Sequence, residues 1–253
     1  MEVIDRILTL RLQRHQLALL LDPEKFTDSS ALDQWVRRLT DKRLYREGVY
    51  MGPDYLFVGG STGSLTQTFV SQLKRWLPIP VVLFPGNTTQ FAPNADALLF
   101  LSVLSSRHPD LLVGNHIAIA RQVKASGIET IPMGYILIDG GCPTSVAEAT
   151  HSLPLAQDDV SAVVDTAVAA ELLGKRLVYL EAGSGARIPV ATEIIAAVRQ
   201  ELSIPLIVGG GIRTIRMMQD AYHAGADIVV IGNHFEQHPD EIIDFCHARF
   251  TSY

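Results

Sequence analysis

The sequence predicts an α/β protein that forms a single (β/α)8 barrel of the TIM type over residues 1–253. The length of 253 residues is close to that of one such barrel. Short, wholly apolar runs alternate with segments whose apolar residues recur at helical spacing, and the last three apolar runs each end in glycine, serine or asparagine. Near-continuous apolar strands are typical of a parallel sheet that is buried on both faces.

Eight apolar runs are the predicted barrel strands. The first is closed by Asp22-Pro23, the second by the glycine-rich residues 59–63 and the third by residues 85–89, all of which are turn formers. In chain order the strands are expected at residues 17–21, 55–58, 80–84, 97–101, 131–138, 177–180, 206–208 and 228–231.

Helices are expected after these strands because apolar residues recur three or four positions apart. Asp28 and Ser29 are capping candidates for the first helix, and Gly127 and Gly174 end later ones. The helical patterns cover residues 32–39, 65–73, 117–126, 160–168, 194–198 and 214–223, with a last helix after Pro239. Eight βα units favour the closed barrel, although an open doubly wound sheet is also compatible with them.

Composition narrows the class of function. The formal net charge is -6 without a long basic run, which argues against a nucleic-acid partner. The longest apolar runs are strand-sized, so no transmembrane segment is expected, and the N-terminus lacks the pattern of a signal peptide. Cys142 and Cys246 belong to no motif, so we expect free thiols and a cytoplasmic location.

Three glycine-containing turns are predicted to bind phosphate after strands six, seven and eight. Glycine lacks a Cβ, so a phosphate oxygen can approach the backbone N–H groups closely, helped by the N-terminus of the next helix. Barrels of this type commonly bind phosphate after strands seven and eight. The expected phosphate contacts are Gly183, Ser184, Gly185, Gly210, Gly211, Gly232 and Asn233.

Polar side chains at strand ends are the other functional candidates, since the C-terminal face of a barrel carries the active site. They are Asp22, Ser61, Asn87, Asp139, Glu181 and Asn233, each of which could instead be a cap or turn residue. Asp22 is expected to have no capping role, because Asp28 and Ser29 come later. Asp22 and Ser61 end adjacent strands, where a carboxylate and a hydroxyl could share Mg²⁺ with a diphosphate.

Several segments together resemble the geranylgeranylglyceryl phosphate synthase family, which includes bacterial prenyl-glyceryl-phosphate synthases. The most specific feature is Tyr-x-Glu-x-Gly-Ser-Gly at 179–185, combined with the Asp-Pro and Gly-Gly-Ser strand ends. The similar segments are residues 19–25, 58–63, 84–87, 179–185, 209–213 and 232–233, within a resemblance that runs from about Gln16 to Phe235. Residues 134–141 resemble the branch that includes the larger archaeal and the Bacteroidetes-type enzymes.

The resemblance implies a Mg²⁺-dependent prenyltransferase. The family joins the 3-hydroxyl of sn-glycerol 1-phosphate to geranylgeranyl diphosphate as an ether and releases diphosphate. The resemblance assigns Asp22 and Ser61 to Mg²⁺. Glu181 lies one strand end from the phosphate turn, where it is placed to orient the hydroxyl or take its proton. Tyr179 lies on the same face of the strand and is expected to hydrogen-bond the glycerol. The expected contacts to the glycerol phosphate are Tyr179, Leu180, Glu181, Ala182 and the seven residues of the phosphate turns.

A C20 tail needs an apolar groove, because each buried CH₂ group contributes about 0.8 kcal/mol. Phe84, Phe91, Phe100 and Leu104 are the candidates, and we expect a C20 preference. The stretch Gly114-Asn115-His116 departs from the family pattern near this groove and leaves the chain-length preference open. The long segment 139–158 is expected to be either a lid or a surface excursion.

The resemblance also implies a homo-oligomer, and transient contact with a membrane surface is possible. The candidates for an exposed apolar interface are Trp35, Val70, Trp76 and Ile119.

Two other classes of function remain open from the sequence. One is another phosphate-binding barrel enzyme, which would need a lysine or paired carboxylates at the strand ends. No lysine lies at a predicted strand edge, and Lys25 is three residues past Asp22. The other is a non-catalytic barrel that senses a glycerol phosphate, which would not need the pair of Asp22 and Ser61.

Overall fold

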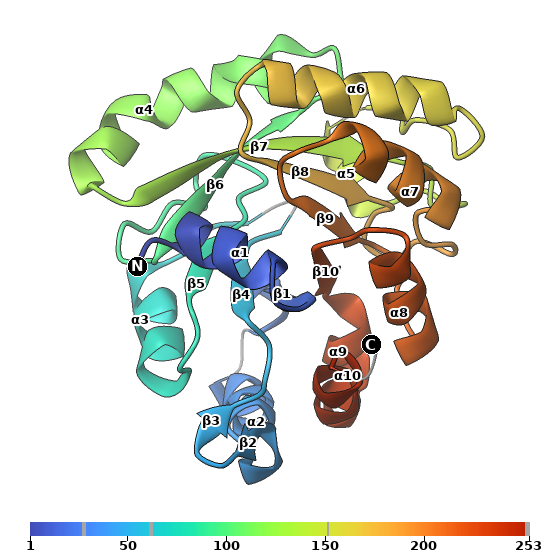
Figure 1. Ribbon diagram of the computed structural model, residues 1–253. Coiled ribbons are helices and arrows are strands. Elements are labelled where there is room, and N and C mark those ends of the chain that lie inside the picture. The colour runs from blue at the N-terminus through green and yellow to red at the C-terminus, as the bar shows by residue number, and fades with distance from the viewer. Residues whose placement is uncertain (27–28, 61–62, 151, 251–253) are drawn as a thin grey trace.

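The computed structural model describes residues 1–26, 29–60, 63–150 and 152–250. At its centre eight parallel strands form a closed barrel, in which each strand pairs with its neighbours in chain order and the last pairs with the first (Figure 1). The predicted TIM-type barrel is therefore confirmed. The barrel strands are β1 (Gln16–Leu21), β4 (Tyr55–Val58), β5 (Val81–Leu83), β6 (Ala97–Val103), β7 (Glu129–Leu137), β8 (Leu177–Glu181), β9 (Leu206–Gly209) and β10 (Ile228–Ile231).

Strand β8 shows why these apolar runs become barrel strands. All five of its residues are buried. Leu177 and Tyr179 belong to the cluster inside the barrel, whereas Val178 and Leu180 belong to the cluster between the strands and the helices. Successive side chains of a strand point to opposite faces, so a strand that is covered on both faces must be apolar throughout.

Helices surround the barrel where the 3.6-residue periodicity predicts them. Several begin at residues whose side chains accept a backbone N–H: Thr66 before α3, Asp159 before α6 and Thr214 before α8. The outer helices are α2 (Ser29–Leu39), α3 (Gln67–Trp76), α4 (Asn115–Ser126), α6 (Val160–Leu172), α7 (Thr192–Glu201), α8 (Ile215–His223), α9 (Asn233–Gln237) and α10 (Ile242–Ala248).

One connection differs from the expected eight βα units. Residues 84–96, between β5 and β6, contain no helix. Pro85, Gly86 and Pro93 explain this, because proline lacks an N–H for the helix ladder and glycine loses more conformational entropy. A short hairpin, β2 (Tyr45–Arg46) with β3 (Val49–Tyr50), also lies between α2 and β4.

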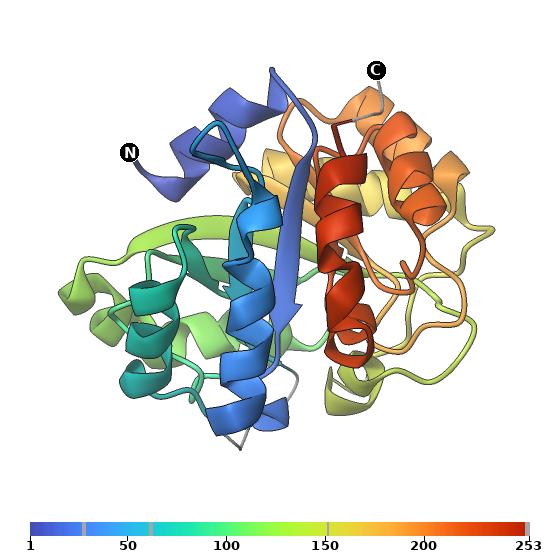
Figure 2. The ribbon, with the colours of Figure 1, turned by 90° about the horizontal axis from the view of Figure 1, so that it is seen from below.

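Helix α1 (Val3–Arg11) lies across the end of the barrel where the strands begin (Figure 2). Val3, Ile4 and Ile7 pack into the cluster inside the barrel. The Glu129 carboxylate at the start of β7 accepts the N–H groups of Val3 and Ile4, at 2.5 and 2.9 Å, and so caps this helix. Figure 2 shows the short α5 (Ser145–Thr150) near the opposite end, toward which β1 points.

Within the described ranges, no helix is long and apolar enough to cross a bilayer. Cys142 and Cys246 are free cysteines. Trp35 and Val70 are buried in the core, so the expectation that they lie on an exposed apolar surface is wrong. Their positions on α2 and α3 face the barrel, where the apolar stripe of each helix packs.

Candidate active site

A cavity of about 830 Å³ lies at the C-terminal ends of the barrel strands. It collects residues from the ends of β1, β4, β5, β8, β9 and β10, together with α4 and α5. The predicted site residues that line it are Asp22, Tyr179, Glu181, Gly183, Ser184, Gly185, Gly210, Gly211, Gly232 and Asn233. Leu180 and Ala182 are fully buried in the cluster behind this wall, and Ser61 lies outside the described residues.

The turn after β9 shows why the sequence needs glycine there. Gly210 has φ +82°, a conformation that favours glycine, and a Cβ on it would lie 2.4 Å from Oε1 of Glu181 and 2.6 Å from the backbone N of Gly183. The turn after β9 therefore lies directly against the Glu181 carboxylate and the backbone of the turn after β8. These turns line the cavity together with Gly232 and Asn233 after β10. Their backbone N–H groups are suited to a phosphate, except that of Gly183, which Glu181 accepts.

Glu181 ends β8 and is the only carboxylate among the described residues that is buried at this turn, with 6% of its surface exposed. Its Oε1 accepts the N–H of Gly183 at 2.7 Å, which fixes the carboxylate beside the phosphate turn. Burial raises the pKa of the Glu181 carboxyl, and contacts with Tyr179 and with the Gly183 N–H partly oppose the rise. A carboxylate with a raised pKa is a stronger proton acceptor than an exposed one.

Tyr179 lies two residues earlier and faces the inside of the barrel, as its spacing predicts. Its ring packs against Phe84 and Tyr135, with centroid distances of 5.6 and 5.5 Å. The Tyr179 hydroxyl lies close enough to Glu181 to lower the pKa of the carboxyl group. It forms no hydrogen bond of regular geometry, so the hydroxyl oxygen is buried without a partner. A buried hydroxyl without a regular partner is suited to a hydrogen bond with a ligand.

Asp22 caps a short 3-10 turn, Pro23–Lys25, by accepting the N–H of Glu24 at 3.1 Å. The expectation that Asp22 has no capping role is therefore wrong, because the chain turns directly after β1. The other capping candidate, Asp28, lies outside the described residues. The carboxylate nevertheless lines the cavity and lies against Gly60, where a Cβ would be 2.8 Å from it. The ends of β1 and β4 are adjacent, as expected, with Leu21 paired to Val58.

Two further strand-end candidates have local turn contacts. The Asn87 side chain accepts the N–H of Thr89 at 2.8 Å and donates to the carbonyl of Gly63 at 3.2 Å. The Asp139 carboxylate accepts the N–H of Gly141 at 2.8 Å. Asn87 lines the cavity and Asp139 does not, so Asp139 is a turn residue.

Lys25 lines the cavity although it was not among the predicted site residues. Its ammonium donates to Oδ1 of Asn233 at 2.7 Å and forms an ion pair with Oε2 of Glu236 at 2.6 Å. Asn233 in turn donates from Nδ2 to the Ser184 hydroxyl at 2.6 Å. Lys25 follows the end of β1 by four residues, but its partners lie more than 200 positions further along the chain, so only the closed barrel brings them together.

The cavity also has an apolar arm that extends along β6. Phe84 and Leu101 line its inner part, and Phe100 and Ile119 line the part between β6 and α4. The ring of Phe100 lies 4.1 Å from that of His116. Phe91 and Leu104 do not line the cavity, because they pack in the outer core. Val146 and Ala149 of α5, inside the long segment 139–158, cover the same cavity.

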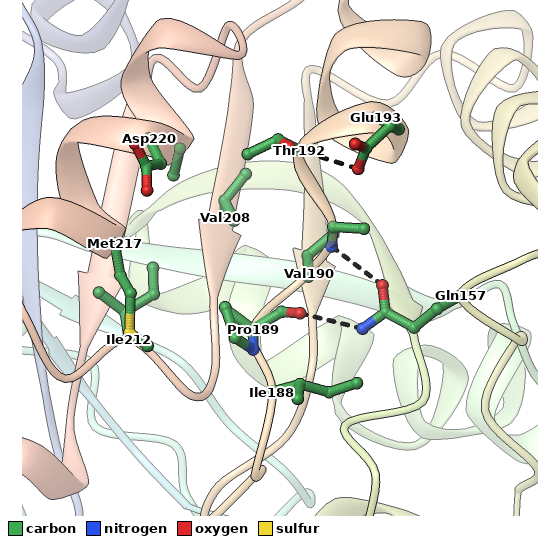
Figure 3. Close-up of a pocket in the computed structure, with 12 residues that line it drawn as sticks. Gln157, Ile188, Pro189, Val190, Thr192, Glu193, Val208, Ile212, Met217 and Asp220 are labelled. Carbon is green, nitrogen blue, oxygen red and sulfur yellow. Dashed lines mark hydrogen bonds between the residues drawn. The ribbon is translucent and has the colours of Figure 1, made fainter.

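A second, smaller cavity of about 350 Å³ lies between α8 and the segment that leads into α7 (Figure 3). The Gln157 side chain bridges this segment, donating to the carbonyl of Pro189 at 3.0 Å and accepting the N–H of Ala191 at 2.9 Å (Figure 3). None of the predicted site residues lines it. The larger cavity is therefore the candidate active site.

Comparisons with known proteins agree with this choice. The PcrB family matches residues 10–249. A protein named geranylgeranylglyceryl phosphate synthase from Zunongwangia profunda is 41% identical over 238 residues, which cover 93% of this chain and 97% of the relative. One of the same name from Korarchaeum cryptofilum is 35% identical over 232 residues, which cover 91% of each chain.

A solved structure has the same architecture over the whole chain. It is (S)-3-O-geranylgeranylglyceryl phosphate synthase from Thermoplasma acidophilum in complex with its substrate sn-glycerol-1-phosphate. The two structures superpose with a TM-score of 0.87 at 31% sequence identity, covering 100% of this chain and 98% of the other.

Proposed function

The chain belongs to the PcrB family and is a prenyltransferase, and we propose that it uses Mg²⁺ to join sn-glycerol 1-phosphate to geranylgeranyl diphosphate. The class of reaction follows from relatives about 40% identical over most of the chain, which are named geranylgeranylglyceryl phosphate synthases. One observation carries the assignment of the site. A single cavity joins three glycine turns, the buried Glu181 and an apolar arm.

The two substrates occupy different parts of this cavity. We place the phosphate of sn-glycerol 1-phosphate on the N–H groups of the turns after β8, β9 and β10, and its glycerol part beside Tyr179 and Glu181. The prenyl tail occupies the apolar arm along β6, and its diphosphate lies near the ends of β1 and β4. The contact of Glu181 with the phosphate turn supports this arrangement, because it holds the carboxylate beside the bound glycerol.

The reaction breaks the bond between the allylic C1 and the diphosphate oxygen, which leaves with the electron pair. The 3-hydroxyl oxygen of the glycerol forms the new C–O bond to C1, and its proton passes to the Glu181 carboxylate. Tyr179 holds the hydroxyl toward C1. The raised pKa of Glu181 suits this role, because a general base works best when its pKa lies nearer to the operating pH.

Asp22 and Ser61 are proposed to hold the Mg²⁺. The Asp22 carboxylate fits, since it faces the cavity and lies directly against Gly60, whose missing Cβ leaves room beside it. Within the described residues no three acidic, histidine or cysteine side chains cluster as a metal site, so the ion would complete its shell from the diphosphate and water. When bound, Mg²⁺ neutralises the leaving diphosphate.

We also propose a cytoplasmic homo-oligomer, with transient contact with a membrane surface as the way the prenyl substrate arrives. The apolar tail of that substrate supports the membrane contact, as do the exposed Val113, just before α4, and Ile117, in the first turn of α4.

Binding of geranylgeranyl diphosphate with and without Mg²⁺ tests the proposed site. We expect the wild-type protein to bind the diphosphate tightly only with Mg²⁺, and Asp22→Asn to lose this dependence and most of the turnover while still binding sn-glycerol 1-phosphate. Turnover of Asp22→Asn within a few-fold of wild type would reject the metal assignment. A barrel that only senses glycerol phosphate would bind no prenyl diphosphate at all.

A further inference from the structure

Lys25 connects two regions of the cavity that the sequence places far apart. It ends the 3-10 turn that Asp22 caps, and its side chain reaches the start of α9. There it contacts Asn233, which belongs to the third phosphate turn and donates to Ser184 of the first. Lys25 thus lies between the end of β1, where Asp22 is, and the surface of the phosphate turns.

A phosphate bound at the glycine turns needs positive charge nearby, and Lys25 can supply it. A bound phosphate monoester carries about -1.5 to -2 charges near neutral pH. The described lysine and arginine residues that line the cavity are Lys25 and Arg213. Arg213 donates to the backbone carbonyls of Ala186 and Arg187, which ties its guanidinium to the loop after β8. The ammonium of Lys25 donates to the side chain of Asn233, which belongs to the phosphate turns, and so brings a positive charge to them.

Glu236 is the counter-ion of Lys25 in this structure. Its side chain is 15% exposed, and burial raises the pKa of its carboxyl while Lys25 lowers it. The charge of Asp22 also raises the pKa of Glu236, because two like charges repel each other. A phosphate that arrives beside Asn233 adds further negative charge near Glu236. An anionic ligand therefore competes with Glu236 for the ammonium.

We propose that Lys25 is a further substrate-binding residue, whose ammonium exchanges Glu236 for the phosphate of sn-glycerol 1-phosphate when that substrate binds. An ammonium has three N–H donors, so Lys25 can keep its bond to Asn233 while it changes its charged partner. Charge-assisted hydrogen bonds of this kind are among the stronger ones in proteins. The inference rests on the proposed function of the cavity, because it assumes that the three turns bind this phosphate.

The test is calorimetric titration of sn-glycerol 1-phosphate into the full-length protein and three variants. Lys25→Gln should raise the Kd about tenfold or more, since a hydrogen bond to a charged group is lost. Glu236→Gln should lower the Kd, because it removes the competing carboxylate. Lys74→Gln is the matched control and should keep the wild-type Kd. Lys74 also pairs with a carboxylate, that of Asp96 at 2.8 Å, and donates to the backbone carbonyl of Asn94 at 3.0 Å, but it lies outside the cavity.

The KM for geranylgeranyl diphosphate, measured on the same proteins, identifies which phosphate group Lys25 serves. We expect it to change less in Lys25→Gln than the Kd of sn-glycerol 1-phosphate. If Lys25→Gln and Glu236→Gln raise the Kd of sn-glycerol 1-phosphate equally, the ion pair has a purely structural role and the inference is overturned. A change confined to the prenyl diphosphate would overturn it as well. If wild type binds no sn-glycerol 1-phosphate, the proposed function fails too, whereas normal binding in Lys25→Gln rejects this inference alone.

Discussion

Glu181 combines burial with a fixed position. The carboxylate is held by the Gly183 N–H, and the absence of a Cβ on Gly210 leaves it the room it occupies. The sequence already indicated this residue, because strand spacing places it at the end of β8 and two positions from Tyr179. The shift of its pKa could not be predicted in this way, since burial depends on β9 and on the aromatic cluster around Tyr179.

Replacing Glu181 by glutamine keeps the shape of the side chain but removes the proton acceptor. The loss of a general base typically costs about 10² to 10⁴ in rate, and we expect kcat of Glu181→Gln to fall by that much. The Kd of sn-glycerol 1-phosphate should change little, because the glutamine oxygen can still accept the Gly183 N–H. Single-turnover rates and calorimetric Kd values on both proteins check this. If binding collapses while kcat persists, Glu181 is a binding group only.

The raised pKa of Glu181 has a consequence for pH dependence. The carboxylate form acts as the base, so kcat/KM should fall on the acid side with an apparent pKa above the ordinary value of about 4.3. In the pH range between the ordinary and the raised pKa the native state binds more protons than the unfolded state. The Glu181 contribution to the free energy of unfolding is therefore lost as pH rises through that range.

Urea unfolding of wild type and Glu181→Gln at several pH values measures this contribution. The free energy of unfolding of wild type relative to the variant should decrease as pH rises, and kcat/KM of wild type should increase over the same range. A difference that grows with pH would contradict the assignment of the raised pKa to this carboxyl.

At the scale of the elements, the strand ends and glycine turns could be predicted from the sequence because each is marked by a local pattern. The closed barrel then brings them together in one cavity. A run of apolar residues followed by glycine defines a strand end without reference to the rest of the chain. The contacts of Lys25 could not be predicted in this way, and neither could the capping role of Asp22, which depends on a turn of only three residues. The absence of a helix after β5 could have been predicted from Pro85, Gly86 and Pro93. The prediction of eight βα units did not take these residues into account.

The apolar arm along β6 gives a prediction for chain length. We expect Phe100→Ala to raise the rate ratio of C35 over C20 donors by roughly tenfold, as accommodating two more CH₂ groups at about 0.8 kcal/mol each would do. Phe91→Ala is the control, because Phe91 packs in the outer core and does not line the cavity. The test measures the reaction rates of wild type, Phe100→Ala and Phe91→Ala with the C20 and the C35 donor. An unchanged ratio in Phe100→Ala would place the tail elsewhere.

At the scale of the whole molecule, a buried ionic cluster joins the end of the chain to the barrel. Asp54 accepts from Arg14 and Arg249 and from the backbone N–H of Leu17, and Arg249 is 1% exposed. Breaking a buried pair leaves an uncompensated charge, so this cluster fixes α10 against β1 and β4. The apolar pattern predicted the barrel, but this contact joins residues 195 positions apart and has no local signal.

Assembly is a prediction at the same scale. We expect at least a dimer, since the family it resembles is commonly oligomeric, although Trp35 and Val70 are buried and cannot form the interface. Trp76, which is 37% exposed, is the remaining aromatic candidate. Light scattering at micromolar concentration gives the mass directly, and a value of 27.7 kDa would be that of a monomer and reject the prediction.

The central claim is that one cavity joins a glycerol phosphate to a prenyl diphosphate. The most direct measurement incubates the protein with Mg²⁺, geranylgeranyl diphosphate and either sn-glycerol 1-phosphate or its mirror image, sn-glycerol 3-phosphate, and identifies the products by mass. We expect one ether product and released diphosphate, formed from sn-glycerol 1-phosphate far faster than from its enantiomer and abolished by EDTA. Absence of the ether product, with both substrates bound, would contradict the account.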